Sequence, residues 1–95
     1  MARRRHLIAY DICEPRRLRQ VCKVMEAYGT RLQYSVFLCD LSELELVQWR
    51  GDIHVVMDYR EDSVVMIDPG ATDSAAAVTQ LGKPRTLPTS GPTVL

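Results

Sequence analysis

The order of the predicted elements indicates an α+β sandwich in which two helices lie on one face of a sheet. Three observations carry this prediction. Short apolar runs rich in strand formers occupy 6–12 and 63–68. Between them, an apolar stripe with helical spacing follows Pro15, and a Ser-x-x-Glu capping motif begins at Ser42. The alternation of strand and helix patterns therefore places the chain among small α+β domains.

The chain has 95 residues, which is room for one domain, and we place that domain at 1–82 and a disordered tail at 83–95. A fold this short buries only about 60–65% of its unfolded surface, so pairing with a second copy is expected. The longest apolar runs fall far short of the roughly 20 residues that span a bilayer, and the apolar stretch after the basic start is too short for a signal peptide. We therefore expect a cytoplasmic protein without membrane contact.

The run at 6–12 is expected to be a central strand, with Leu7, Ala9 and Asp11 on one face. Asp11 lies at the C-terminal end of this strand, where a carboxylate must reach solvent, form a pair or bind a cation. Two copies of the chain would supply two carboxylates, and Mg²⁺ accepts one or two together with waters and phosphate oxygens. An ion pair with a neighbouring arginine, or a cap on the turn before Pro15, is the alternative.

A helix is predicted from Pro15, which suits a first helical position, to just before Gly29. Its buried stripe is predicted at Leu18, Val21, Cys22, Met25 and Tyr28. The opposite side carries the basic residues Arg16, Arg19 and Lys23. Because cations near a helix N-terminus oppose the helix dipole, a bound phosphate would offset that cost. A solvated polar face is the alternative.

The next segment, 30–41, contains no Gly, Pro or Asn-Gly pair, so the residues alone predict one long strand. Ser42 and Glu45 have the spacing at which each side chain caps the other's backbone N–H, which starts a second helix that ends near Asp58. Gly51 should weaken this helix by about 1 kcal/mol relative to Ala. Its buried stripe is predicted at Leu46, Trp49, Ile53, Val56 and Met57.

After the strand at 63–68, small residues at 71–77 form a connector and 78–81 is a candidate edge strand. The strands are apolar on both sides, although the helices cover only one face of the sheet. We therefore expect a second copy to cover the other face, which gives a homodimer packed sheet to sheet.

The net charge of zero conceals a division along the chain. Residues 1–31 carry eight Arg or Lys against three acids, whereas 32–80 carry nine acids against two arginines. Such polarity is typical of a protein that holds a polyanion on one face, while the acidic remainder limits indiscriminate binding.

Several other residues have plainer interpretations. The three cysteines form no close pair and are expected to be reduced, and the two histidines have no ligand partners at metal spacing. Arg3, Arg4 and Arg5 are expected to form a frayed basic terminus. Tyr34 and Phe37 could stack on bases, but the scattered aromatic residues form no platform, so packing in the core or a dimer interface is predicted.

Four segments together resemble one known family. They are Leu-Ile-Ala-Tyr-Asp-Ile at 7–12, Pro-Arg-Arg-Leu-Arg at 15–19, Tyr-Gly-Thr-Arg-Leu-Gln-Tyr-Ser-Val-Phe at 28–37 and Asp-Ser-Val-Val-Met-Ile at 62–67. They are similar to the CRISPR-associated small endonuclease family, the dimeric partner of the CRISPR integrase in spacer acquisition. The Gly-x-Arg-x-Gln-x-Ser-Val-Phe stretch is the most specific part of the resemblance.

The resemblance implies a ferredoxin-like βαββαβ fold, in which 30–41 forms two strands that turn near Tyr34 and Ser35. A further C-terminal strand often adds to the partner subunit's sheet, and 78–81 is the candidate. It also implies that Asp11 of both protomers holds Mg²⁺ and is the catalytic residue. Contacts with nucleic acid are expected from Arg16, Arg17, Arg19, Lys23 and Arg31, and positions near the metal from Tyr10, Ser35 and Phe37.

Two functions from different classes fit these features. One is an Mg²⁺-dependent endonuclease that cuts phosphodiesters of single-stranded RNA or of DNA. The other is a non-catalytic dimeric scaffold that bridges integrase subunits and holds duplex DNA along its basic faces. A small-molecule-sensing module is a third, plainer alternative, and it would need a ligand pocket at the dimer interface.

Overall fold

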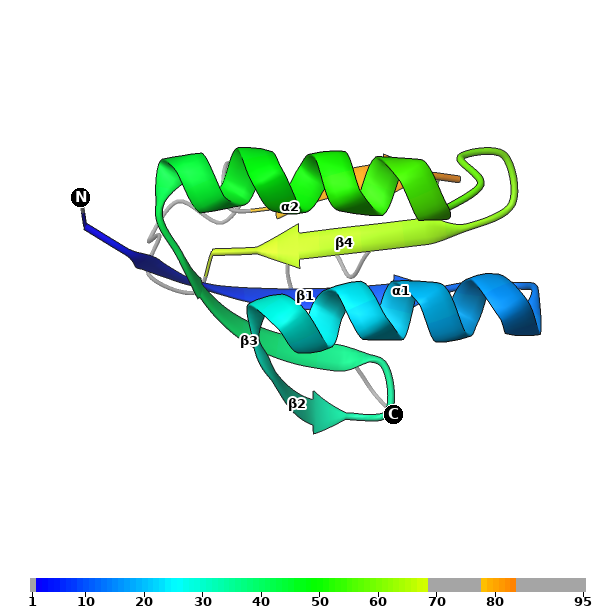
Figure 1. Ribbon diagram of the computed structural model, residues 1–95, viewed down its shortest axis with the longest axis horizontal. Coiled ribbons are helices and arrows are strands. Elements are labelled where there is room, and N and C mark those ends of the chain that lie inside the picture. Colours follow the sequence, from blue (N-terminus) through cyan, green and yellow to red (C-terminus); the bar gives the residue numbers. More distant parts are fainter. Residues whose placement is uncertain (1, 69–77, 84–95) are drawn as a thin grey trace, which may run out of the picture.

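The computed structural model describes residues 2–68 and 78–83, and it confirms the α+β prediction (Figure 1). Seven elements follow one another along the chain. They are β1 (Arg4–Asp11), α1 (Pro15–Tyr28), β2 (Thr30–Gln33), β3 (Val36–Leu41), α2 (Glu43–Val56), β4 (Ser63–Ile67) and β5 (Val78–Gly82).

The strands form one antiparallel sheet in the order β2-β3-β1-β4-β5, so β1 is its centre. Figure 1 shows both helices on the same side of this sheet, side by side. The register pairs Ile8 of β1 with Phe37 of β3 and with Met66 of β4. Because paired residues point to the same face, these three side chains meet the helices. This arrangement is the ferredoxin-like sandwich that the resemblance implied.

The core lies between the sheet and the two predicted helical stripes. Val21 and Met25 of α1, and Trp49 and Ile53 of α2, are fully buried. The indole Nε1 of Trp49 donates to Sδ of Met25 at 3.2 Å, which joins the two helices inside the core. Both predicted stripes are therefore confirmed.

Local interactions at the helix ends agree with the sequence, except in one respect. The side chain of Glu14 caps α1, and Ser42 and Glu45 form the predicted capping box on α2. Gly29 follows α1 as predicted, but its φ of −162° is extended backbone. A Cβ there would lie 2.4 Å from Sγ of Cys39, so glycine is required by the close approach of β3.

Two predictions made from the residues alone, one for segment 30–41 and one for the N-terminal arginines, were wrong. Segment 30–41 is a hairpin of β2 and β3 that turns at Tyr34 and Ser35, as the resemblance implied. The basic terminus is not frayed, because β1 already begins at Arg4. The predicted edge strand at 78–81 is confirmed as β5, and it pairs with β4 of its own chain. The connector at 71–77 and the tail beyond Lys83 lie outside the described residues.

The sheet face without helices is apolar. It carries side chains from β1, β3 and β4, most of them half-buried, namely Leu7, Ala9, Val36, Leu38, Val65 and Ile67. We refer to this surface as the open face. Neither described helix is long and apolar enough to cross a membrane.

Candidate nucleic-acid and metal site

Asp11 is exposed at the C-terminal end of the central strand, on the edge of the open face. Its register partner in β4 is the buried Ser63. The side chain of Glu14, not that of Asp11, caps the first helix, because Glu14 accepts the hydrogen bond from the N–H of Arg17 at 2.8 Å. The strand thus presents a carboxylate at the place that the sequence predicted.

The loop that follows Asp11 is fixed by a buried carboxylate. Asp62 is 0% exposed and accepts hydrogen bonds from Nε of Arg17 at 2.9 Å, from the N–H of Cys13 at 3.1 Å and from the N–H of Asp58 at 2.9 Å. Burial alone would raise the pKa of Asp62, but these hydrogen bonds outweigh it and lower the pKa below its usual value. Asp62 therefore joins the loop before α1 to the loop after α2.

Arg17 differs from the other basic residues of α1. Its side chain is only 24% exposed, its guanidinium is held by Asp62, and Glu61 lies 3.6 Å away. The sequence grouped Arg17 with the residues that contact nucleic acid. The structure gives it a partner inside the fold, which is a structural role, and its contact with nucleic acid stays a prediction.

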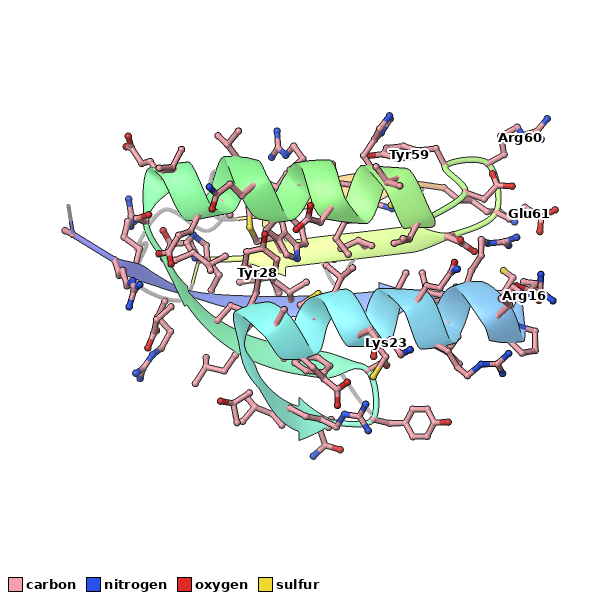
Figure 2. The ribbon with its side chains drawn as sticks, in the orientation of Figure 1. Arg16, Lys23, Tyr28, Tyr59, Arg60 and Glu61 are labelled. Carbon is pink, nitrogen blue, oxygen red and sulfur yellow. The ribbon has the colours of Figure 1, made fainter. Side chains whose placement is uncertain are left out.

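Arg16, Arg19 and Lys23 form an exposed basic surface along α1, which we call the α1 basic face. Figure 2 shows Arg16 at the start of the helix and Lys23 farther along it. Within the described part of the chain, none of the three forms a salt bridge. Their charge is therefore available to an anion from outside.

The three arginines at and just before the start of β1 are engaged within the chain. Nε of Arg3 lies 2.9 Å from Oε1 of Glu45, and Nε of Arg5 lies 3.1 Å from Oδ1 of Asp40. Arg4 pairs with Asp68. All three positive charges are thus matched by acids of the same chain.

A groove of about 160 Å³ lies between α1 and the β2–β3 hairpin. Its lining residues are Tyr10, Leu18, Arg19, Cys22, Arg31 and Tyr34. The guanidinium of Arg31 lies 5.5 Å from the ring centroid of Phe37 and also contacts Sγ of Cys22, which holds it at the groove. Tyr34, which the sequence placed in the core or an interface, is 78% exposed in this chain.

Of the three residues predicted to lie near the metal, two are separated from Asp11 by the sheet. Tyr10 and Phe37 are buried on the helix side, with ring centroids 6.1 Å apart, whereas Asp11 is at the open face. Burial raises the pKa of Tyr10 to about 12, with Cys22 as a second cause. Ser35 is closest to the strand end, because its carbonyl accepts from the N–H of Tyr10 at 3.1 Å. In the single chain Tyr10 and Phe37 pack in the core, and a position near the metal stays a prediction for them.

The described residues contain no cluster of three His, Cys, Asp or Glu that could hold a metal ion. The three cysteines are free, in agreement with the sequence. One chain offers Asp11, whose carboxylate oxygens are ligands of the type that Mg²⁺ prefers. Since Mg²⁺ keeps several waters and needs only one or two carboxylates, this donor fits a hydrated ion shared between two copies of the chain.

The sequence analysis missed Asp62 as the centre of a network. In the sequence, Asp62 stands out only as the first residue of the segment at 62–67 that resembles the known family. The available signal was a carboxylate directly before an apolar strand, which is costly to bury without a partner. Its partner Arg17 is 45 residues away along the chain, and no local pattern connects them.

The chain matches proteins of one known family. A family model described as CRISPR associated protein Cas2 matches residues 4–75. The CRISPR-associated endoribonuclease Cas2 1 of Rhodospirillum rubrum is 40% identical over 79 residues, which covers 82% of this chain and 78% of that protein. The CRISPR-associated endoribonuclease Cas2 of Geobacter sulfurreducens is 32% identical over 79 residues, which covers 82% and 83% of the two chains.

Solved structures share the same fold. A crystal structure of Streptococcus pyogenes Cas2 matches with a TM-score of 0.64 and 30% identity, covering 82% of this chain and 99% of that one. A hypothetical protein, TT1823 from Thermus thermophilus, matches with a TM-score of 0.63 and 25% identity, covering 98% and 96% of the two chains.

Proposed function

The chain belongs to the CRISPR-associated Cas2 family, and from this premise we propose that it is a metal-dependent endonuclease that cuts phosphodiester bonds of RNA or DNA. Relatives named endoribonucleases support nuclease chemistry in general. One observation carries the proposal to this chain: the exposed carboxylate of Asp11 ends the central strand at the margin of an apolar sheet face that neither described helix covers. That position suits a ligand shared across a dimer.

The homodimer is part of this proposal. The open face carries six aliphatic side chains that no helix covers, and a patch of this kind on a small domain is suited to association. Packing two open faces together would bury these side chains and bring the two Asp11 carboxylates toward one another. The two protomers would then hold one ion between them.

The chain's own residues have separate roles in this mechanism. Asp11 supplies oxygen ligands, and the α1 basic face and Arg31 bind backbone phosphates and fix the position of the strand. The network around Asp62 keeps the loop after Asp11 in one conformation. A bound Mg²⁺ would polarise the phosphodiester and lower the pKa of a water molecule.

A non-catalytic scaffold is the second candidate, and one observation favours it. Arg16, Arg19 and Lys23 lie on a helix, and both helices cover the sheet face opposite to the open face (Figure 1). A duplex bound along the α1 basic face would lie away from Asp11. In this function the dimer bridges CRISPR integrase subunits and holds duplex DNA without cutting it.

The deciding experiment measures cleavage of labelled single-stranded RNA and duplex DNA, with Mg²⁺ and with chelator. Asp11→Asn should reduce the rate by more than the roughly 10–100-fold typical of changes at residues that only orient a metal ligand, because a direct ligand is lost. Asp40→Asn is the matched control, since Asp40 is an exposed aspartate of the same sheet.

Cleavage that requires both the metal and Asp11, and that survives Asp40→Asn, supports the nuclease. Duplex binding without any cleavage, unchanged in Asp11→Asn, would exclude the nuclease and leave the scaffold.

A further inference from the structure

We propose that the groove between α1 and the β2–β3 hairpin binds one unpaired nucleotide, with its base stacked on Tyr34 and its phosphates held by Arg19 and Arg31. This inference rests on the proposed function, because it defines the form of nucleic acid that the protein takes. The ligand class is single-stranded nucleic acid, either RNA or DNA.

The first observation is the state of Tyr34. Its side chain is 78% exposed in the hairpin turn, although tyrosine has a large apolar ring. The ring contacts found in the described residues pair Tyr10 with Phe37 and His54 with Tyr59, and they do not include Tyr34. A free aromatic face next to basic residues is the arrangement on which unpaired bases stack.

The second observation is the composition of the groove. Leu18, Cys22 and Tyr10 provide a largely apolar lining, while Arg19 and Arg31 contribute guanidinium groups. Arg31 is held in place by the ring of Phe37 and by Cys22, so little side-chain entropy remains to be lost when it binds an anion. Guanidinium groups bind phosphate through paired N–H donors.

The size of the groove limits the kind of ligand that fits. Pockets for small molecules typically measure about 300–1,000 Å³, and this groove measures only about 160 Å³. It therefore suits one ring rather than an entire cofactor. Bases within a duplex already have both faces covered by their neighbours, so Tyr34 is left for a base outside a duplex.

The third observation is the position of the groove relative to Asp11. Ala9 of β1 pairs with Val36 of β3, and the N–H of Tyr10 donates to the carbonyl of Ser35. In an antiparallel pair, one step forward on β1 is one step back on β3, so Asp11 comes level with Tyr34. The groove therefore lies at the same end of the sheet as the carboxylate, on the helix side, whereas Asp11 is at the open face.

The test measures dissociation constants by fluorescence anisotropy in chelator, so that no cleavage occurs. The probes are a single-stranded RNA, a single-stranded DNA and a blunt duplex. Tyr34→Ala should weaken binding of the single strands about 5- to 150-fold, which is the loss of one aromatic stacking contact. Tyr34→Phe should retain it, and duplex binding should change less than about 2-fold. The matched control is Tyr59→Ala, an exposed tyrosine beyond the end of α2.

Three results would overturn the inference. In the first, Tyr34→Ala leaves single-strand binding unchanged. In the second, it weakens single strands and duplex equally. In the third, it shifts the dimer to monomer by light scattering, which assigns Tyr34 to the interface. Failure here is separable from failure of the proposed function, because cleavage that depends on Asp11 and Mg²⁺ is measured independently.

Discussion

Two groups of basic residues flank the central strand, and their surroundings differ. At the start of β1, Arg3 and Arg5 each face a carboxylate about 3 Å away, in Glu45 and Asp40. After the end of β1, the α1 basic face has no salt bridge with any described residue. The two groups contribute similar charge to the sequence, but only the second offers it to a ligand.

Arg17 differs from both groups. It belongs to the second group by sequence, but its guanidinium is paired with a carboxylate that is completely buried. Pairing and burial, rather than the number of arginines, therefore decide which residues stabilise the chain and which leave their charge open to a ligand. Substitutions in the paired and unpaired groups test this distinction.

The largest effect is expected from Asp62→Ala. This change removes the partner of Arg17 and the acceptor for two backbone N–H groups. The free energy of unfolding should fall by about 3 kcal/mol, the lower end of the range for a broken buried pair, because Arg17 keeps some exposure. Urea denaturation measures the change. A loss below about 1 kcal/mol would place Arg17 with the surface arginines, and Asp40→Ala is the control.

The same network predicts a pH dependence. The pKa of Asp62 is lower in the folded chain than its usual value, so the carboxylate stabilises the fold above that usual value, near pH 4. This contribution is lost as the pH falls through the lower, folded pKa. The free energy of unfolding should therefore decline below about pH 4 in the wild type. Asp62→Asn should flatten the decline, and an unchanged slope would argue against the assignment.

The α1 basic face should control the salt dependence of binding. Replacing Arg16 and Lys23 with Gln should lower the slope of log Kd against log salt by about 2, or about 1 for each phosphate contact. Replacing Arg3 and Arg5 with Gln removes the same charge from the paired group and should leave the slope nearly unchanged. Equal slopes for the two double variants would remove the distinction between the groups.

The smallest effect is expected for one surface pair. Arg3→Gln should change the free energy of unfolding by less than about 1 kcal/mol, because Arg3 is mostly exposed. Glu45→Ala should cost about 1 kcal/mol more, since Glu45 also accepts the backbone N–H of Ser42 in the capping box. Thermal unfolding of the two variants measures this difference, and equal values would mean that the cap contributes nothing.

The sequence was sufficient for features that depend on neighbouring residues. Both helices, the capping box at Ser42 and the position of Asp11 follow from spacing within a few residues. The hairpin was missed by residue patterns because the turn at Tyr34 and Ser35 carries neither Gly nor Asn. It was obtained only from the resemblance.

Features that depend on distant residues were not predictable in the same way. The pairs of Arg3 with Glu45 and of Arg17 with Asp62 span 42 and 45 residues, so periodicity does not contain them. The exposure of Tyr34 was also missed, because Tyr34 alternates with Leu32 and Val36, which is the pattern of a buried strand face. These long-range contacts determine which arginines are free.

The central position of β1 also governs how the chain comes together during translation. Leu7 pairs with Leu38 and Ile67, which follow it by 31 and 60 residues. At about 5–20 residues per second, the ribosome needs roughly 3–12 s to produce the second partner after the first strand has been made. Until then the edge of β1 that pairs with β4 has no partner. The complete sheet therefore forms only after β4 has been made.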